Sequence, residues 1–187
     1  FPKLTGVDIV LGPEMKSTGE IMGIDDDYAR ALYKAMVASG VDVPIRGTLL
    51  ATIADHDKLE AEEIIRGFHR LGYYIYATEG TARFLRERGI EAEVVFKLHD
   101  RTPNLIDLIR AGKVDLLINT ISTDKRTERE AVLIRRASVE MGIPCLTSLD
   151  TARALLLALQ ARMEGQPFAC KTIDGYLARE CVARYPK

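Results

Sequence analysis

The chain has 187 residues, of which 47% are hydrophobic and 28% charged. This composition is typical of a folded globular domain and excludes a disordered or low-complexity chain. The 26 basic and 27 acidic residues give a formal net charge of -1, so no overall field favours nucleic acid or an anionic membrane surface, and we expect neither as a partner. The apolar runs fall well short of the ~20 residues that cross a bilayer, and no signal peptide is recognisable.

Three cysteines, Cys145, Cys170 and Cys181, are too few and too scattered for a disulfide framework or a zinc site. Cys145 lies in an apolar run, where we expect it to be buried and reduced, as in a cytoplasmic protein. The sequence begins Phe1-Pro2-Lys3 without a methionine, and we expect a fragment or a processed piece of a longer chain.

Residues 1–46 are rich in turn-forming and polar residues, and only a stretch from Asp25 to about Ser39 has a helical pattern. From residue 47 to about 165, short apolar runs alternate with amphipathic stretches. The runs predict strands over 48–54, 73–77, 92–98, 114–120 and 143–148. Since they are continuously apolar, they are typical of parallel strands covered on both faces. The sequence thus predicts a doubly wound α/β domain, with a five-stranded, mainly parallel sheet and helices on both faces.

The helices between these strands carry terminal signals. Glycines that suit the left-handed conformation are expected to close four of them, at Gly72, Gly89, Gly112 and Gly142. Predicted N-caps are Asp57, Thr102 before a proline, and Thr127. A long helix over about 150–163 follows the last strand, and residues 166–187 form a tail without a clear pattern.

Ligands of an open parallel sheet bind beyond the carboxyl ends of its strands. The loops at this edge carry hydroxyls, an amide, a glycine and cations, and the candidate effector-binding residues are Lys58, Thr78, Gly80, Thr81, Lys97, Asn119, Thr120, Lys125 and Arg126. A helix N-terminus beside a glycine and threonine hydroxyls suits a phosphate. Alternatively, the Thr78–Thr81 turn is a simple capping turn, and Lys97 is a solvated strand end.

Lys58 lies in the first turn of its predicted helix, where a cation opposes the helix dipole. That placement favours a bound anion nearby. No nucleophile elbow, phosphate-binding P-loop or dinucleotide fingerprint is present, and the histidines lack metal-ligand spacing, so we expect no catalytic residue and no metal site.

Residues 47–55, 77–82 and 114–120 resemble the methylglyoxal-synthase-like domain family, and residues 134–137 and 143–147 continue the likeness. Residues 12–20 resemble the stretch that precedes this domain in the large chains of carbamoyl-phosphate synthases. The resemblance runs from residue 1 to about Gly165. It implies the end of an ATP-grasp synthetase module and a linker over 1–46, an allosteric domain over 47–165, and a carboxyl-terminal tail over 166–187.

This resemblance implies an allosteric region that binds a nucleotide monophosphate, with UMP as inhibitor and IMP as activator. It would tune ATP-dependent carbamoyl phosphate synthesis for pyrimidine and arginine biosynthesis. The family's effector positions match in type at Lys58, Thr78, Thr81, Lys97 and Asn119. The expected partners are the remainder of the large chain, a glutaminase small chain and a possible further copy of the chain. The fragment itself would need no cofactor, whereas the parent ligase would use ATP with Mg or Mn.

Several alternatives stay open. Ile121 stands where the better-known bacterial pattern has a hydroxyl residue, which leaves the choice of effector undecided. An N-acetylglutamate-type site is one alternative, although such relatives have alanine at the position of Gly80. A structural or oligomerisation module with a degenerate pocket is another. Methylglyoxal synthase chemistry needs a carboxylate base, and Thr102 and Ser122 stand at the family's positions for it, so we do not expect that activity.

Overall fold

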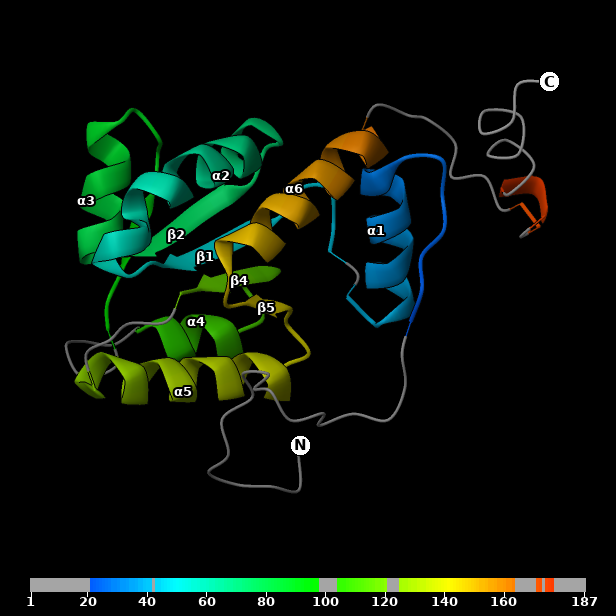
Figure 1. Ribbon diagram of the computed structural model, residues 1–187. Helices are drawn as coiled ribbons and strands as arrows, with labels where there is room; N and C mark the ends of the chain where they lie inside the picture. The colour runs from blue at the N-terminus through cyan, green and yellow to red at the C-terminus, as the bar shows by residue number, and fades with distance from the viewer. Residues whose placement is uncertain are drawn as a thin grey trace.

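The computed structural model describes residues 21–41, 43–97, 104–120, 125–163, 171–172 and 174–176. A five-stranded sheet lies at the centre with helices on both faces, as Figure 1 shows. The elements are α1 (Tyr28–Ala38), β1 (Thr48–Thr52), the 3-10 turn η1 (Asp55–Asp57), α2 (Lys58–Arg70), β2 (Tyr74–Thr78), α3 (Glu79–Glu87), β3 (Glu93–Val95), α4 (Leu105–Arg110), β4 (Leu116–Asn119), α5 (Lys125–Glu140), β5 (Cys145–Leu146) and α6 (Leu149–Met163). The predicted doubly wound α/β class is confirmed.

The strand order is β3-β2-β1-β4-β5, and every neighbouring pair is parallel. β1 therefore has β2 on one side and β4 on the other. The chain leaves β1 through α2 on one face of the sheet and reaches β4 through α4 on the other face. The winding direction thus reverses at β1 and β4, which is where open α/β sheets form a crevice beyond their carboxyl ends.

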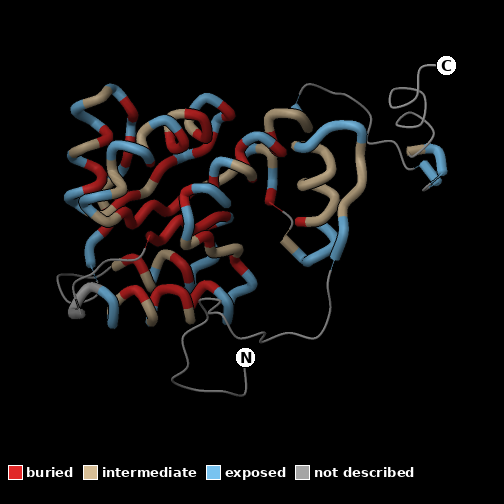
Figure 2. The backbone as a smooth tube through the Cα atoms, in the orientation of Figure 1, coloured by how far each residue is buried: buried red, intermediate tan, exposed pale blue. Residues whose placement is uncertain are grey.

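The hydrophobic core has two parts, one on each face of the sheet. Leu49 and Ala51 of β1 pack with α2, α3 and α6, whereas Leu50 between them packs with α4 and α5. Figure 2 shows the buried backbone concentrated in the sheet and on the inward sides of these helices. Burial on both faces explains why the strands are continuously apolar.

The predicted helix-closing glycines are confirmed. Gly72, Gly89, Gly112 and Gly142 all have positive φ, between 65° and 94°. Each follows a helix directly and leads into the next strand. A side chain at these φ values would be strained, so glycine sets the point at which each of these helices ends.

Asp57 stands at the N-cap position of α2 as predicted, but it makes no side-chain capping bond, because the 3-10 turn η1 places it in helical conformation before α2. The predictions of Thr127 and Thr102 as N-caps are wrong. Thr127 lies inside α5, which begins two residues earlier at Lys125. Thr102 lies outside the described residues, and the cap of α4 is Asn104, whose side chain accepts from the amides of Ile106 and Asp107. The Asp107 carboxylate in turn accepts a hydrogen bond from the Asn104 backbone amide at 2.9 Å, which completes a capping box.

The amino-terminal helix α1 packs along α6. Met36 near its end and Val43 after it are buried in the same core cluster as Leu49 and Ala51 of β1. Two residues near the carboxyl terminus also contact this region: Lys171 pairs with Asp26, and Lys34 Nζ donates to Tyr176 Oη at 3.1 Å. The division of the chain into segments 1–46, 47–165 and 166–187 stays a prediction.

Cys145 is half-buried rather than buried, because β5 is an edge strand. Within the part of the chain that the structure describes, no helix is both long and apolar enough to span a bilayer.

Candidate anion-binding site

A cavity of about 160 Å³ lies at the carboxyl ends of the strands, at the reversal between β1 and β4. Four of the predicted residues line it, namely Thr78, Lys97, Asn119 and Thr120. Thr52, Asp55 and Glu130 also contribute to its wall. The fold thus brings together loops that follow four different strands.

Lys58 is the first residue of α2, and its side chain reaches across to the start of α3. A Cβ atom added to Gly80 would lie 3.3 Å from Lys58 Nζ. The ammonium also pairs with Asp55, with Nζ 2.6 Å from Oδ1, and the Lys58 side chain is only 16% exposed. Gly80 therefore leaves the space that the ammonium occupies over the first turn of α3.

The start of α3 suits an anion. Thr78 has the extended backbone of an N-cap, but its side chain does not cap the helix. Its hydroxyl instead lies 3.3 Å from the Thr81 hydroxyl. Because the first amides of a helix have no partner within the helix, an oxyanion can accept from them here.

The Thr81 and Thr120 hydroxyls hold the loop after β1. Thr81 is buried, with Oγ1 within 3.4 Å of the Ile53 amide nitrogen and 3.5 Å of the Ile53 carbonyl. Thr120 Oγ1 accepts from the Ala54 amide at 2.8 Å. These bonds position the loop that carries Asp55 and leads into Lys58, and therefore fix where the ammonium lies.

A buried polar chain lies behind the cavity. Asn119 Nδ2 donates to Thr52 Oγ1, and Arg135 Nη1 donates to Asn119 Oδ1 at 3.0 Å. Asn119 and Arg135 are 3% and 1% exposed. These bonds set the orientation of the Asn119 amide.

Sequence reasoning missed Thr52 and Arg135 as members of the site. The available signal was a cation on the apolar face of α5, because Arg135 recurs at helical spacing with the buried Ala131 and Ser138. A buried arginine needs polar partners, so its position pointed to a polar group in the core.

The electrostatics of the site centre on Asp55. The hydrogen bond and charge of Lys58 lower the pKa of the Asp55 carboxyl, and the charges of Lys97 and His56 act in the same direction. Lysines from two loops, after β1 and after β3, thus act on one carboxylate. That carboxylate is 94% exposed.

For five positions of the sequence analysis, the residue or its side chain lies outside the described residues. Lys125 and Arg126 begin α5, and their side chains lie outside the described residues. Ile121 also falls there, as do Thr102 and Ser122. The roles predicted for Lys125 and Arg126 stay predictions.

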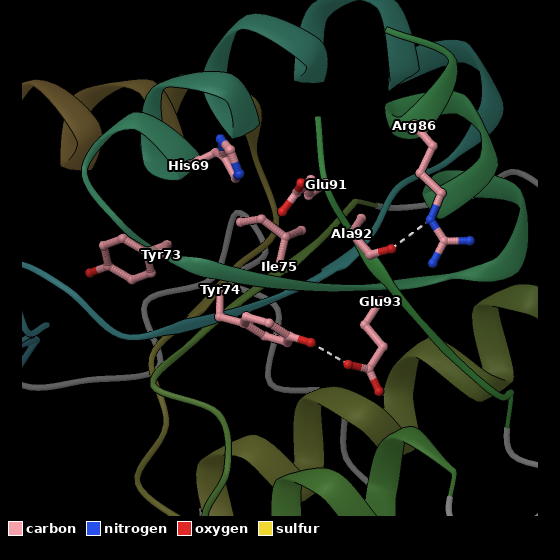
Figure 3. Close-up of a pocket in the computed structure, with 8 residues that line it drawn as sticks. All are labelled: His69, Tyr73, Tyr74, Ile75, Arg86, Glu91, Ala92 and Glu93. Carbon is pink, nitrogen blue, oxygen red and sulfur yellow. Dashed lines mark hydrogen bonds between the residues drawn. The ribbon is translucent and has the colours of Figure 1, made fainter. Parts of the chain in front are cut away.

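A larger cavity of about 380 Å³ lies near the opposite ends of β2 and β3 (Figure 3). Its polar groups largely satisfy one another: Tyr74 Oη donates to the Glu93 carboxylate, and Arg86 Nε donates to the Ala92 carbonyl at 2.8 Å. No lysine lines it, whereas Lys97 and Thr78, the N-cap of α3, line the smaller cavity. Size alone would favour this cavity, but the chemistry of the smaller cavity fits an anion. Among the described residues no His, Cys, Asp or Glu group could hold a metal ion.

Comparison with known proteins gives one family match. The model of the MGS-like domain matches residues 60–147, from α2 to the start of the segment after β5. The match includes Thr78, Gly80, Thr81, Lys97, Asn119 and Thr120 and begins two residues after Lys58. It agrees with the expected likeness to MGS-like domains over residues 60–147.

Two solved structures are similar to the chain. One is methylglyoxal synthase from Elizabethkingia anophelis NUHP1, with 20% identity over 72% of this chain and 92% of that one and a TM-score of 0.46. The other is ForH, with 22% identity over 70% of this chain and 95% of that one and a TM-score of 0.37.

Proposed function

We propose that this chain is an allosteric effector region, which binds a nucleotide monophosphate through its phosphate and tunes a carbamoyl-phosphate synthase. One observation carries the proposal: the Lys58 ammonium lies over Gly80 at the start of α3, and Gly80 is within the residues that match the MGS-like domain. A cation above unpaired helix amides is a favourable environment for a doubly charged phosphate ester.

In the proposed complex, the phosphate accepts hydrogen bonds from Lys58 Nζ and from the first amides of α3 near Gly80. Thr78 and Lys97, which line the cavity, add a hydroxyl and a second positive charge. Asn119 and Thr120 face the sugar or base from the far wall. Lys125 and Arg126 supply outer positive charge.

The site binds without breaking a bond, so the region acts through coupling to a distant active site. Such coupling typically amounts to about 1–3 kcal/mol. The ATP-dependent chemistry, with its Mg or Mn, would reside in the remainder of the large chain, with a glutaminase small chain as partner, in the cytoplasm. An N-acetylglutamate-type effector is the alternative ligand class, and a purely structural or oligomerising role is the alternative without a ligand.

Calorimetric titration with UMP, IMP and N-acetylglutamate tests this proposal on the wild type and on Lys58→Ala. We expect nucleotide binding in the wild type. Since a charge-assisted hydrogen bond contributes about 1.5–3 kcal/mol, Lys58→Ala should weaken it about ten- to hundredfold.

Lys113→Ala is the matched control, because this lysine is exposed in the turn after α4, away from the cavity. It should leave the affinity unchanged. Equal affinities for the wild type and Lys58→Ala would contradict the proposed phosphate contact. Binding of N-acetylglutamate but of neither nucleotide would favour the alternative ligand class, and conversion of dihydroxyacetone phosphate to methylglyoxal would contradict a purely regulatory role.

A further inference from the structure

The carboxylate of Asp55 forms an ion pair with the Lys58 ammonium, which is the cation of the candidate site. Its Oδ1 lies 2.6 Å from Lys58 Nζ, and the same ammonium lies over Gly80. Lys97 from another loop also acts electrostatically on Asp55. The side chain thus places a negative charge beside the group that would bind the phosphate.

The local structure allows this carboxylate to leave. Asp55 lies at the first position of the short turn η1, and its side chain is 94% exposed, whereas that of Lys58 is 16% exposed. Rotation of the Asp55 side chain into solvent would bury no charge and break no buried bond. Lys58, held between α2 and α3, would stay where it is.

We propose that Asp55 is an internal competing anion, which pairs with Lys58 in the unliganded site and is displaced when a phosphate binds. This inference rests on the proposed function, because it assumes that Lys58 binds the effector phosphate. Asp55 thereby lowers the effector affinity and sets the concentration at which the site responds.

The magnitude follows from the exposure of the pair. An exposed ion pair is worth only a fraction of a charge-assisted bond in a dry site, so removal of the competitor should tighten phosphate binding about two- to fivefold. This tightening should depend on Lys58, because without its ammonium Asp55 has no ion pair at Lys58 from which a phosphate would displace it.

The test is a double-mutant cycle with UMP and inorganic phosphate as probes, measured by calorimetry on the wild type, Asp55→Asn, Lys58→Ala and the double variant. Asp55→Asn should tighten both probes in the presence of Lys58 and change neither in its absence. Glu60→Gln is the matched control, because it removes one negative charge from the neighbouring first turn of α2, where Glu60 pairs with Arg153 at 3.0 Å instead of with Lys58. It should leave the affinity unchanged.

The outcomes separate the two proposals. If the wild type binds and Asp55→Asn binds equally or more weakly, Asp55 is not a competitor and the inference fails while the proposed function stands. If Glu60→Gln tightened binding as much as Asp55→Asn, general repulsion between negative charges would explain the change in affinity. That result would also overturn the inference. If neither the wild type nor Asp55→Asn binds either probe, the proposed function fails, and the inference with it. Thermal melts of each variant check that the fold is retained.

Discussion

Lys58 and Gly80 come from different helices, and the absence of a side chain at Gly80 is what lets the ammonium approach α3. Gly80 does not have the positive φ of the helix-closing glycines, so its role is spatial and not conformational. A methyl group there would meet only the end of a flexible side chain, at 3.3 Å. The cost of a larger residue therefore falls on the position of the ammonium and not on the backbone.

Gly80→Ala is expected to leave the thermal stability equal or higher, because alanine is the better helix former by up to about 1 kcal/mol. It should weaken UMP binding up to about tenfold, through partial loss of one charge-assisted hydrogen bond. Calorimetry and thermal melts measure the two effects. In a Lys58→Ala background the substitution should change the affinity no further, and a full additional loss there would show that the methyl group acts on the ligand directly.

Asn119 depends on a residue that no ligand need touch. Its amide lies between Thr52 and the buried guanidinium of Arg135. Arg135 thus acts as a positioning residue within the core. Its bond to Asn119 explains why a cation is tolerated on the apolar face of α5.

At the scale of the elements, the starts of α2 and α4 differ in how they are stabilised. α4 has only six residues and begins with a full capping box. α2 begins after a 3-10 turn, and Asp57 does not cap it with its side chain. A short helix gains a larger share of its stability from its cap, because few internal hydrogen bonds support it.

This difference predicts unequal effects of two similar substitutions. Asn104→Ala should lower the free energy of unfolding by about 0.5–2 kcal/mol, the usual value of an N-cap. Asp57→Ala should change it little, because the Asp57 side chain makes no capping bond to α2. Urea midpoints compare them, and equal losses would mean that Asp57 caps α2 after all.

At the scale of the whole molecule, the order of the strands creates the site. The loops after β1 and β4 are separated by more than sixty residues, yet these strands pair directly, with Thr52 opposite Asn119. The cavity lies where the winding reverses. The helix α1 is joined to this body through its packing against α6.

The Asp25 carboxylate holds the segment before α1 on that helix: it is 6% exposed and pairs with Arg30 Nε at 3.1 Å and Lys34 Nζ at 2.7 Å. Burial acts to raise the pKa of Asp25, but the Lys34 hydrogen bond, the Asp26 amide and the charges of Lys34 and Arg30 outweigh it, so the pKa is lowered from 3.8. A carboxyl with a lowered pKa contributes stability above its ordinary pKa, and that contribution is lost as the pH falls through the lowered value.

Asp25→Asn should therefore cost about 1–3 kcal/mol of unfolding free energy at pH 7, the value of hydrogen bonds to a charged group. The cost should shrink as the pH falls below 3.8, since the wild-type carboxyl then takes up its proton. Denaturant unfolding at several pH values measures this, with Glu87→Gln on the exposed side of α3 as the control. A penalty that does not change with pH would exclude an ionic role for Asp25.

What could be predicted from the sequence was local. Apolar runs mark buried strands and glycines mark helix ends, because both patterns report burial and backbone conformation over a few residues. The polar loops at the carboxyl edge follow from the same patterns, and they include Thr78, Lys97, Asn119 and Thr120, which line the cavity.

Only the tertiary structure decided which of these loops meet. The pairing of β1 with β4, the reach of Lys58 to Gly80 and the bond from Arg135 to Asn119 all join residues far apart along the chain. Local periodicity contains no information on such neighbours, because they depend on how whole elements pack. Two N-caps were predicted at the wrong residue, and Asp57, at the right one, makes no capping bond, for a related reason. Which side chain caps a helix depends on the turn that precedes it, and a spacing motif does not specify that turn.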